Sequence, residues 1–98
     1  MHRVLIVGCG GIAPAHIEGY LHSGADVTVT HLADQNLQRA QALIDRYGLT
    51  GAQPVADYRE ALSQVDIVSI CTPPGQHAEI AVAALNLGCH VLLEKPMA

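Results

Sequence analysis

The chain has 98 residues, of which half are hydrophobic and 14% are charged, and its formal net charge is −4. This length allows one small domain with one core, and the composition is that of a chain that folds rather than one that stays disordered. The charges are scattered, and no apolar run approaches the ~20 residues that span a bilayer. We therefore expect neither a nucleic-acid partner nor a membrane one.

The cysteines and histidines do not indicate a metal site. Cys9, Cys71 and Cys89 are odd in number and have no metal-like spacing, and the six histidines are scattered. We expect three buried free thiols, which is typical of a reducing cytoplasm.

A short apolar run at residues 4–7, rich in β-branched side chains, leads directly into a glycine turn. The run predicts a buried strand and the turn predicts the start of a helix. Gly8, Gly10 and Ala13 fit the pattern G-x-G-x-x-G/A. Gly8 suits a tight turn, Gly10 lets a pyrophosphate approach the backbone, and Ala13 lets the helix pack on the strand. The phosphates are then expected at the helix N-terminus.

The helix is expected over about residues 12–22, with Pro14 in its first turn and Gly24 as its stop. A second strand, residues 25–33, ends at Asp34, about 20 residues after Ala13, the spacing of a carboxylate that binds a ribose 2′-hydroxyl.

Asp34 has two interpretations. One is that it binds the ribose, and the other is that it acts as the N-cap of the next helix. One residue can fill both roles. As a ribose ligand it favours NAD over NADP, because a carboxylate repels the 2′-phosphate of NADP. Arg39, on the following helix, weakens this preference for NAD.

The next elements follow from periodicity and turn residues. A second helix is expected over about residues 36–47, closed by Gly48. Its apolar face holds Leu37, Ala40, Leu43, Ile44 and Tyr47. Residues 53–55 predict a brief third strand at a sheet edge, because Pro54 cannot donate to a ladder. Asp57 and Glu60 have capping-box spacing and predict a short helix to about Ser63.

The last third of the chain repeats the alternation. Residues 66–71 are continuously apolar, as in a strand with both faces covered. A fourth helix is expected over about residues 76–87, and a fifth strand over residues 90–93. The helix's apolar side holds Ile80, Ala81, Ala84 and Leu85.

Alternating strands and helices predict an α/β fold of the Rossmann type. We expect one domain, residues 1–98, with a doubly wound parallel sheet of five strands in the order 3-2-1-4-5. Ligands bind beyond the carboxyl ends of such strands. Four polar or glycine-rich features lie there: residues 8–13, Asp34, residues 72–75, and Glu94-Lys95. Two of them also have simpler interpretations, a stiff turn at Thr72-Pro73-Pro74 and a solvated surface lysine at Lys95.

Three segments together resemble the Gfo/Idh/MocA oxidoreductases. They are residues 8–13 with His16 beyond them, residues 72–81 (TPPGQHAEIA), and residues 88–98 (GCHVLLEKPMA). The resemblance implies hydride transfer between a nicotinamide cofactor, NAD or NADP, and a hydroxyl or carbonyl carbon of a sugar, inositol or related polyol. It also implies a catalytic role for Lys95, which reaches the reacting oxygen. It implies cofactor-binding roles for Gly8, Gly10, Gly11, Ile12, Asp34, Thr72, Pro73, His77 and Glu94.

Members of that family continue into a sixth strand and a substrate-binding domain, which are absent here. We therefore expect no turnover by these 98 residues alone. We also expect residues 90–93 to form an open sheet edge and the chain to form a homodimer, by edge pairing or by exchange of its C-terminal segment. Two other hypotheses remain: a nucleotide-sensing module without chemistry, and a methyltransferase that uses S-adenosylmethionine. Lys95 argues against the first, and the Glu-Lys-Pro ending argues against the second.

Overall fold

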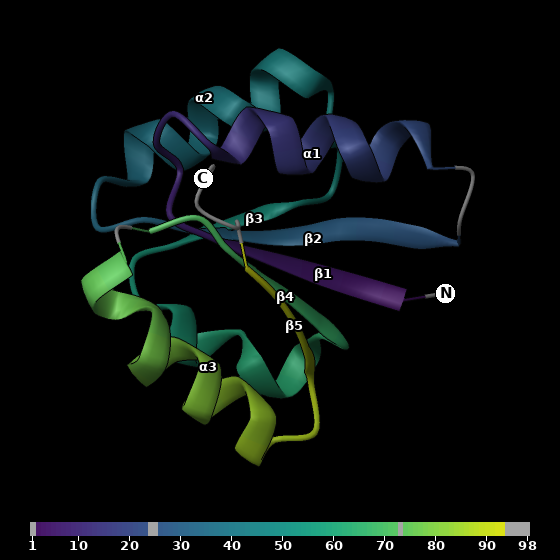
Figure 1. The fold of residues 1–98 in the computed structure, drawn as a ribbon. Coiled ribbons are helices and arrows are strands. Elements are labelled where there is room, and N and C mark those ends of the chain that lie inside the picture. The colour runs from purple at the N-terminus through teal and green to yellow at the C-terminus, as the bar shows by residue number, and fades with distance from the viewer. Residues whose placement is uncertain (1, 24–25, 73, 94–98) are drawn as a thin grey trace, which may run out of the picture.

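The computed structural model describes residues 2–23, 26–72 and 74–93. Five parallel strands form one sheet in the order β3-β2-β1-β4-β5 (Figure 1). The strands are β1 (His2–Val7), β2 (Val27–Ala33), β3 (Gln53–Val55), β4 (Ile67–Ile70) and β5 (His90–Leu93). The order expected from the sequence is confirmed, and Pro54 lies in an edge strand, as expected.

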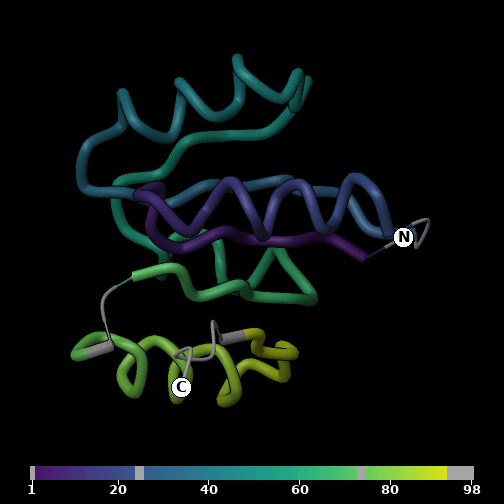
Figure 2. The backbone as a smooth tube through the Cα atoms, turned by 45° about the horizontal axis from the view of Figure 1, so that its top comes forward, coloured from purple at the N-terminus to yellow at the C-terminus, as the bar shows by residue number. Residues whose placement is uncertain are grey.

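Helices cover both faces of the sheet. The helices α1 (Ala13–His22) and α2 (Leu37–Tyr47) lie on one face, and α3 (His77–Asn86) lies on the other (Figure 1). Three short 3-10 helices, η1 (Tyr58–Glu60), η2 (Leu62–Gln64) and η3 (Pro74–Gln76), complete the elements. Figure 2 shows α2 and α3 at opposite ends of the molecule. None of the helices in the described ranges is long and apolar enough to cross a membrane.

The two faces of β1 form the centre of two hydrophobic clusters. Val4 and Ile6 pack toward α1 and α2, whereas Leu5 and Val7 pack toward α3 and η2. All four side chains are at most 4% exposed. Since each such burial contributes roughly 1.5–3 kcal/mol, aliphatic residues form a core without Phe or Trp.

A bulge interrupts the pairing of β2 with β1. Val4 pairs with Val29 and Leu5 pairs with His31, so Thr30 is an extra residue without a partner on β1. The Thr30 hydroxyl donates to the Val4 carbonyl at 3.4 Å and lies 2.8 Å from Nδ1 of His31. A single extra residue of this kind is what defines a β-bulge.

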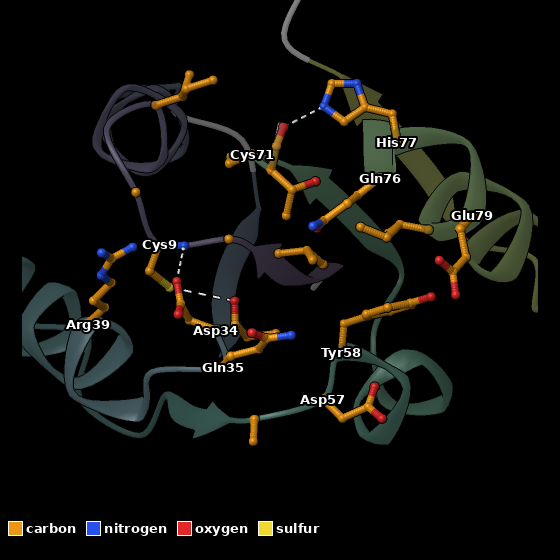
Figure 3. Close-up of a pocket in the computed structure, with 18 of the residues that line it drawn as sticks. Cys9, Asp34, Gln35, Arg39, Asp57, Tyr58, Cys71, Gln76, His77 and Glu79 are labelled. Carbon is orange, nitrogen blue, oxygen red and sulfur yellow. Dashed lines mark hydrogen bonds between the residues drawn. The ribbon is translucent and has the colours of Figure 1, made fainter. Parts of the chain in front are cut away.

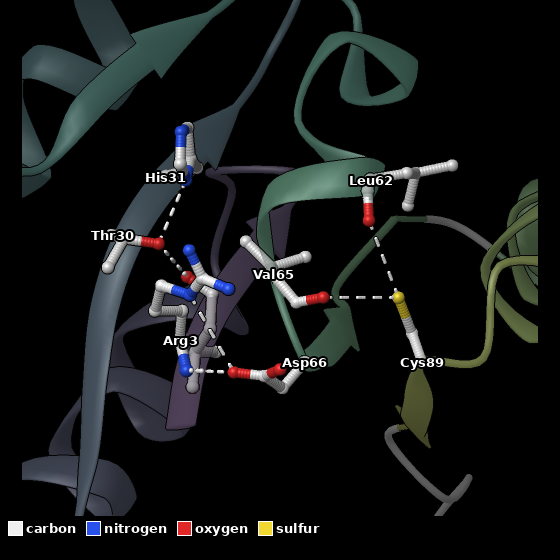
Figure 4. Close-up of polar contacts among 8 residues, drawn as sticks. Arg3, Thr30, His31, Leu62, Val65, Asp66 and Cys89 are labelled. Carbon is white, nitrogen blue, oxygen red and sulfur yellow. Dashed lines mark hydrogen bonds and ion pairs between the residues drawn. The ribbon is translucent and has the colours of Figure 1, made fainter. Parts of the chain in front are cut away.

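The amino ends of the strands are fastened by polar contacts (Figure 4). The Arg3 amide donates to Oδ2 of Asp66 at 2.8 Å, and this bond lowers the pKa of the Asp66 carboxyl. The Cys89 thiol donates to the carbonyls of Leu62 and Val65, at 3.6 and 3.5 Å. These contacts lie away from the carboxyl ends of the strands, so they stabilise the sheet rather than form a ligand site.

The helices agree with the sequence except in three places. The expected helix from Asp57 to Ser63 is wrong: η1 and η2 stand there, separated at Ala61. Asp57 accepts from the Arg59 amide at 2.9 Å, and the Arg59 side chain pairs back onto Asp57.

The other two differences concern helix faces. Leu85 is 60% exposed, whereas Ile80 and Ala84 on the same helix are buried. Leu37 is also exposed, at the first turn of α2. The end of α2 is as expected, because Gly48 has a left-handed φ of 62°. Gly24, the expected stop of α1, lies outside the described residues.

Candidate functional site

A cleft of about 940 Å³ opens at the carboxyl ends of the strands. Figure 3 shows Asp34 and Arg39 on one side of it and Tyr58 and Glu79 on the other. It is lined by Val7, Gly8, Cys9, Gly10, Gly11, Ile12, Ala33, Asp34, Gln35, Arg39, Ala56, Asp57, Tyr58, Arg59, Cys71, Thr72, Gln76, His77, Glu79 and Ile80.

The glycine turn is packed against the end of β4. Gly8 has a φ of +92°, and a Cβ added there would lie 2.8 Å from Cγ2 of Thr72. The Gly8 amide donates to the Ala33 carbonyl at 2.8 Å, which ties the turn to the end of β2 as well. Only glycine fits this position, because it alone tolerates both the backbone angle and the close approach.

The start of α1 is open toward the cleft. Ile12, the N-cap residue, makes no side-chain capping bond. Among the described residues, none accepts a hydrogen bond from the amides of Gly10, Gly11 or Ile12. A Cβ at Gly10 or Gly11 would meet nothing within 4 Å. Unpaired amides at a helix N-terminus, with free space before them, fit a pyrophosphate.

Asp34 bridges the glycine turn and the start of α2. Its Oδ2 accepts from the Cys9 amide at 2.9 Å, and its Oδ1 accepts from the Asn36 amide at 2.8 Å. The N-cap of α2 is Asn36, whose side chain accepts from Gln38 at 3.0 Å. The interpretation of Asp34 as the N-cap is therefore wrong, and its carboxylate is held at the cleft.

The Cys9 thiol lies in the cleft wall, where burial favours its protonated form. Burial, then Asp34, then Cys71 raise its pKa to about 12. Its Sγ donates to the Ala33 carbonyl at 3.8 Å. A thiol that stays protonated at neutral pH acts here as a small packing group. All three cysteines are free and buried, as expected.

Thr72 and His77 form the wall that follows β4. Nε2 of His77 donates to the Thr72 carbonyl at 2.6 Å, so the ring carries its proton on Nε2 when neutral. The Thr72 hydroxyl is buried and has no hydrogen-bond partner among the described residues.

One wall of the cleft was not predicted from the sequence. Residues 56–59 and Glu79 line it. Burial, and then the charge of Glu79, raise the pKa of Tyr58. Because residues 56–59 follow the carboxyl end of β3, the rule that ligands bind beyond strand ends would have identified them.

The structure thus brings seven of the expected site residues to one cleft: Gly8, Gly10, Gly11, Ile12, Asp34, Thr72 and His77. Pro73, Glu94 and Lys95 lie outside the described residues. Within the described ranges, no cluster of His, Cys, Asp and Glu is placed to hold a metal ion.

Comparison with known proteins gives a consistent result. Residues 2–98 match the model of an oxidoreductase family with an NAD-binding Rossmann fold. D-glucoside 3-dehydrogenase of Escherichia coli (strain K12) is 34% identical over 96 residues, which are 98% of this chain and 27% of that protein. Inositol 2-dehydrogenase of Salmonella typhimurium is 36% identical over 95 residues, which are 95% of this chain and 28% of that protein.

Solved structures of dehydrogenases and reductases contain the same fold. A 3-ketoreductase from Actinomadura kijaniata, in complex with NADP and TDP-benzene, superposes with a TM-score of 0.81 at 35% identity, over 97% of this chain and 29% of that one. A myo-inositol dehydrogenase from Lactobacillus casei, in complex with NAD(H) and myo-inositol, shares the fold with a TM-score of 0.88 at 24% identity, over 100% of this chain and 29% of that one. The chain spans less than a third of the length of these relatives.

Proposed function

Because the chain belongs to the Gfo/Idh/MocA family of oxidoreductases, we propose that its cleft binds a nicotinamide dinucleotide for hydride transfer. The observation that carries this proposal is the meeting of the glycine turn and Asp34, whose Oδ2 lies 2.9 Å from the Cys9 amide. The open amides at the start of α1 are suited to hold the pyrophosphate. When bound, the cofactor supplies the hydride chemistry, and the protein supplies orientation and electrostatics.

We further propose that residues 1–98 act as the dinucleotide-binding domain of an enzyme for a sugar, inositol or related polyol. The names of the relatives that act on glucosides and inositol support this substrate class. In this proposal Thr72, Pro73, His77 and Glu94 lie on the nicotinamide side. Lys95 exchanges a proton with the substrate oxygen, as the family resemblance implies.

We favour NAD over NADP. Asp34 supports that choice, because its carboxylate repels a 2′-phosphate. The Actinomadura kijaniata relative was solved with NADP, and Arg39 lies on the Asp34 side of the cleft (Figure 3). We therefore expect a preference for NAD rather than exclusion of NADP.

Two further proposals concern the setting of the protein. Three free, buried cysteines support a reducing compartment, and we place the protein in the cytoplasm. The outermost position of β5 among the described strands supports association into a homodimer.

A thermal-shift titration tests the binding proposal. NADH should raise the melting temperature, because a ligand that binds only the folded state stabilises it. Gly10→Val should abolish the rise by filling the open space before the turn. Gly19→Val, on the exposed side of α1 away from the cleft, is the matched control and should keep the rise. No shift for the unsubstituted chain at millimolar NADH or NAD would refute the proposal.

A further inference from the structure

Asp34 makes more contacts than a ribose ligand needs. Its two carboxylate oxygens accept from the amides of Cys9 and Asn36, and its own amide donates to the Val55 carbonyl at 3.0 Å. A single half-buried residue thus connects the glycine turn, the end of β2, the start of α2 and the end of β3.

The bond to Cys9 bears directly on the glycine turn. No other described residue accepts a hydrogen bond from the Cys9 amide, so that amide is paired only while Asp34 supplies an oxygen. The next three amides, of Gly10, Gly11 and Ile12, have no acceptor among the described residues. The turn is therefore anchored at Cys9 and open immediately after it.

We propose that Asp34 is a positioning residue for the glycine turn and that this role is needed for NADH and NADPH alike. This inference rests on the proposed function, because it assumes that the turn binds the pyrophosphate common to both cofactors. As a ribose ligand Asp34 discriminates between the cofactors, whereas as an anchor of the turn it supports both.

The two roles predict different behaviour for two substitutions. Asp34→Asn removes the charge that repels a 2′-phosphate and keeps one of the two acceptor oxygens. We expect that oxygen to accept from the part-buried Cys9 amide, because water can replace the bond to the exposed Asn36 amide. Asp34→Ala removes the charge and the acceptor together. If repulsion alone mattered, both variants would bind NADPH equally well. If Asp34 also anchors the turn, Asp34→Asn should bind NADPH about tenfold more tightly than Asp34→Ala, the effect of one lost hydrogen bond to a part-buried amide.

The experiment has one readout with cofactor and one without it. Dissociation constants for NADH and NADPH are measured for the unsubstituted chain, Asp34→Asn, Asp34→Ala and Asn36→Ala. Amide hydrogen exchange at Cys9 is followed by NMR in the cofactor-free proteins. Asn36→Ala is the matched control, since it removes the N-cap acceptor of α2 but leaves the Asn36 amide available to Asp34.

We expect Cys9 exchange to rise about tenfold or more in Asp34→Ala and to stay near the unsubstituted rate in Asp34→Asn and Asn36→Ala. Equal NADPH affinity in Asp34→Asn and Asp34→Ala, or unchanged Cys9 exchange in Asp34→Ala, would overturn the inference. If Asp34→Ala fails to fold, Cys9 exchange in the unsubstituted chain that is as fast as exchange at Gly10 and Gly11 would overturn it instead, because Asp34 would then not protect the Cys9 amide. If the unsubstituted chain binds neither cofactor, the proposed function fails, and with it the part of the inference that concerns cofactor binding. The exchange data still decide whether Asp34 anchors the turn.

Discussion

At the scale of single residues, Gly8 and Gly11 have different constraints although they belong to one turn. Gly8→Ala forces a side chain into a left-handed conformation and places its Cβ 2.8 Å from Cγ2 of Thr72. We expect it to lower the free energy of unfolding by about 1–3 kcal/mol. Gly11→Ala meets open space and should stay within about 0.5 kcal/mol. Urea unfolding measures both, and equal losses would contradict this account.

The Cys9 thiol predicts a pH dependence. Its folded-state pKa is raised from 9.0 to about 12, so the unfolded chain loses this proton at a lower pH than the folded one. The contribution of Cys9 to stability is therefore complete below pH 9 and is lost as the pH rises toward 12. Urea unfolding at several pH values between 8 and 11 should show a steeper decline for the unsubstituted chain than for Cys9→Ala. If the free energy of unfolding falls equally with pH in both proteins, burial does not keep the Cys9 thiol neutral.

Residue types predicted the glycine turn and Asp34 but not the bond between them. The spacing of Asp34 from the turn indicates a carboxylate near the ribose, whereas its pairing with the Cys9 amide depends on how two loops meet in space. The bond from the Asn36 amide to Asp34 is local, yet the sequence analysis considered only Asp34 as the cap. The structure has Asn36 there, because the Asn36 side chain accepts from the Gln38 amide.

At the scale of elements, α3 allows a test with two leucine-sized side chains on one helix. Ile80 is 3% exposed and packs on the cluster around β4, whereas Leu85 is 60% exposed. Ile80→Ala should cost about 2–5 kcal/mol of unfolding free energy. Leu85→Ala should stay within about 0.5 kcal/mol, because the side chain loses little burial. Chemical denaturation measures both, and a large loss in Leu85→Ala would mean that something covers this face in solution.

Strands were easier to predict than short helices. β1 and β4 are buried on both faces, so continuous apolar runs identify them. In the segment after β3, the sequence signal for a helix is a single capping residue, Asp57. The Arg59 side chain donates hydrogen bonds to the Asp57 carboxylate. Local bonds of this kind are satisfied by a single 3-10 turn, so nothing extends η1 into an α-helix. The face of α3 was misjudged at Leu85, because an Ala-rich helix is apolar on more than one side.

At the scale of the whole molecule, the outermost position of β5 among the described strands predicts association. Leu92 is 47% exposed on this strand, and unpaired edges invite pairing with another chain. Light scattering from micromolar to millimolar protein should show a dimer that Leu92→Lys weakens. Leu85→Lys, on the exposed side of α3, is the matched control. A monomer throughout would rule out the dimer, and weakening by Leu85→Lys alone would place the contact on α3.

Because of the bulge, Thr30 is the one residue of β2 between Val27 and Ala33 that has no partner on β1. Without Thr30, Val29 and His31 would become neighbours and still stand opposite Val4 and Leu5. Strict alternation would then continue unbroken to Ala33. Deletion of Thr30 therefore leaves every other side chain of β2 on its own face of the sheet. Deletion of another residue of β2 moves the side chains between that residue and Thr30 to the opposite face. In a related strand one residue shorter than β2, the deletion is therefore expected at the position of Thr30. Asp34 then keeps its place beside the glycine turn.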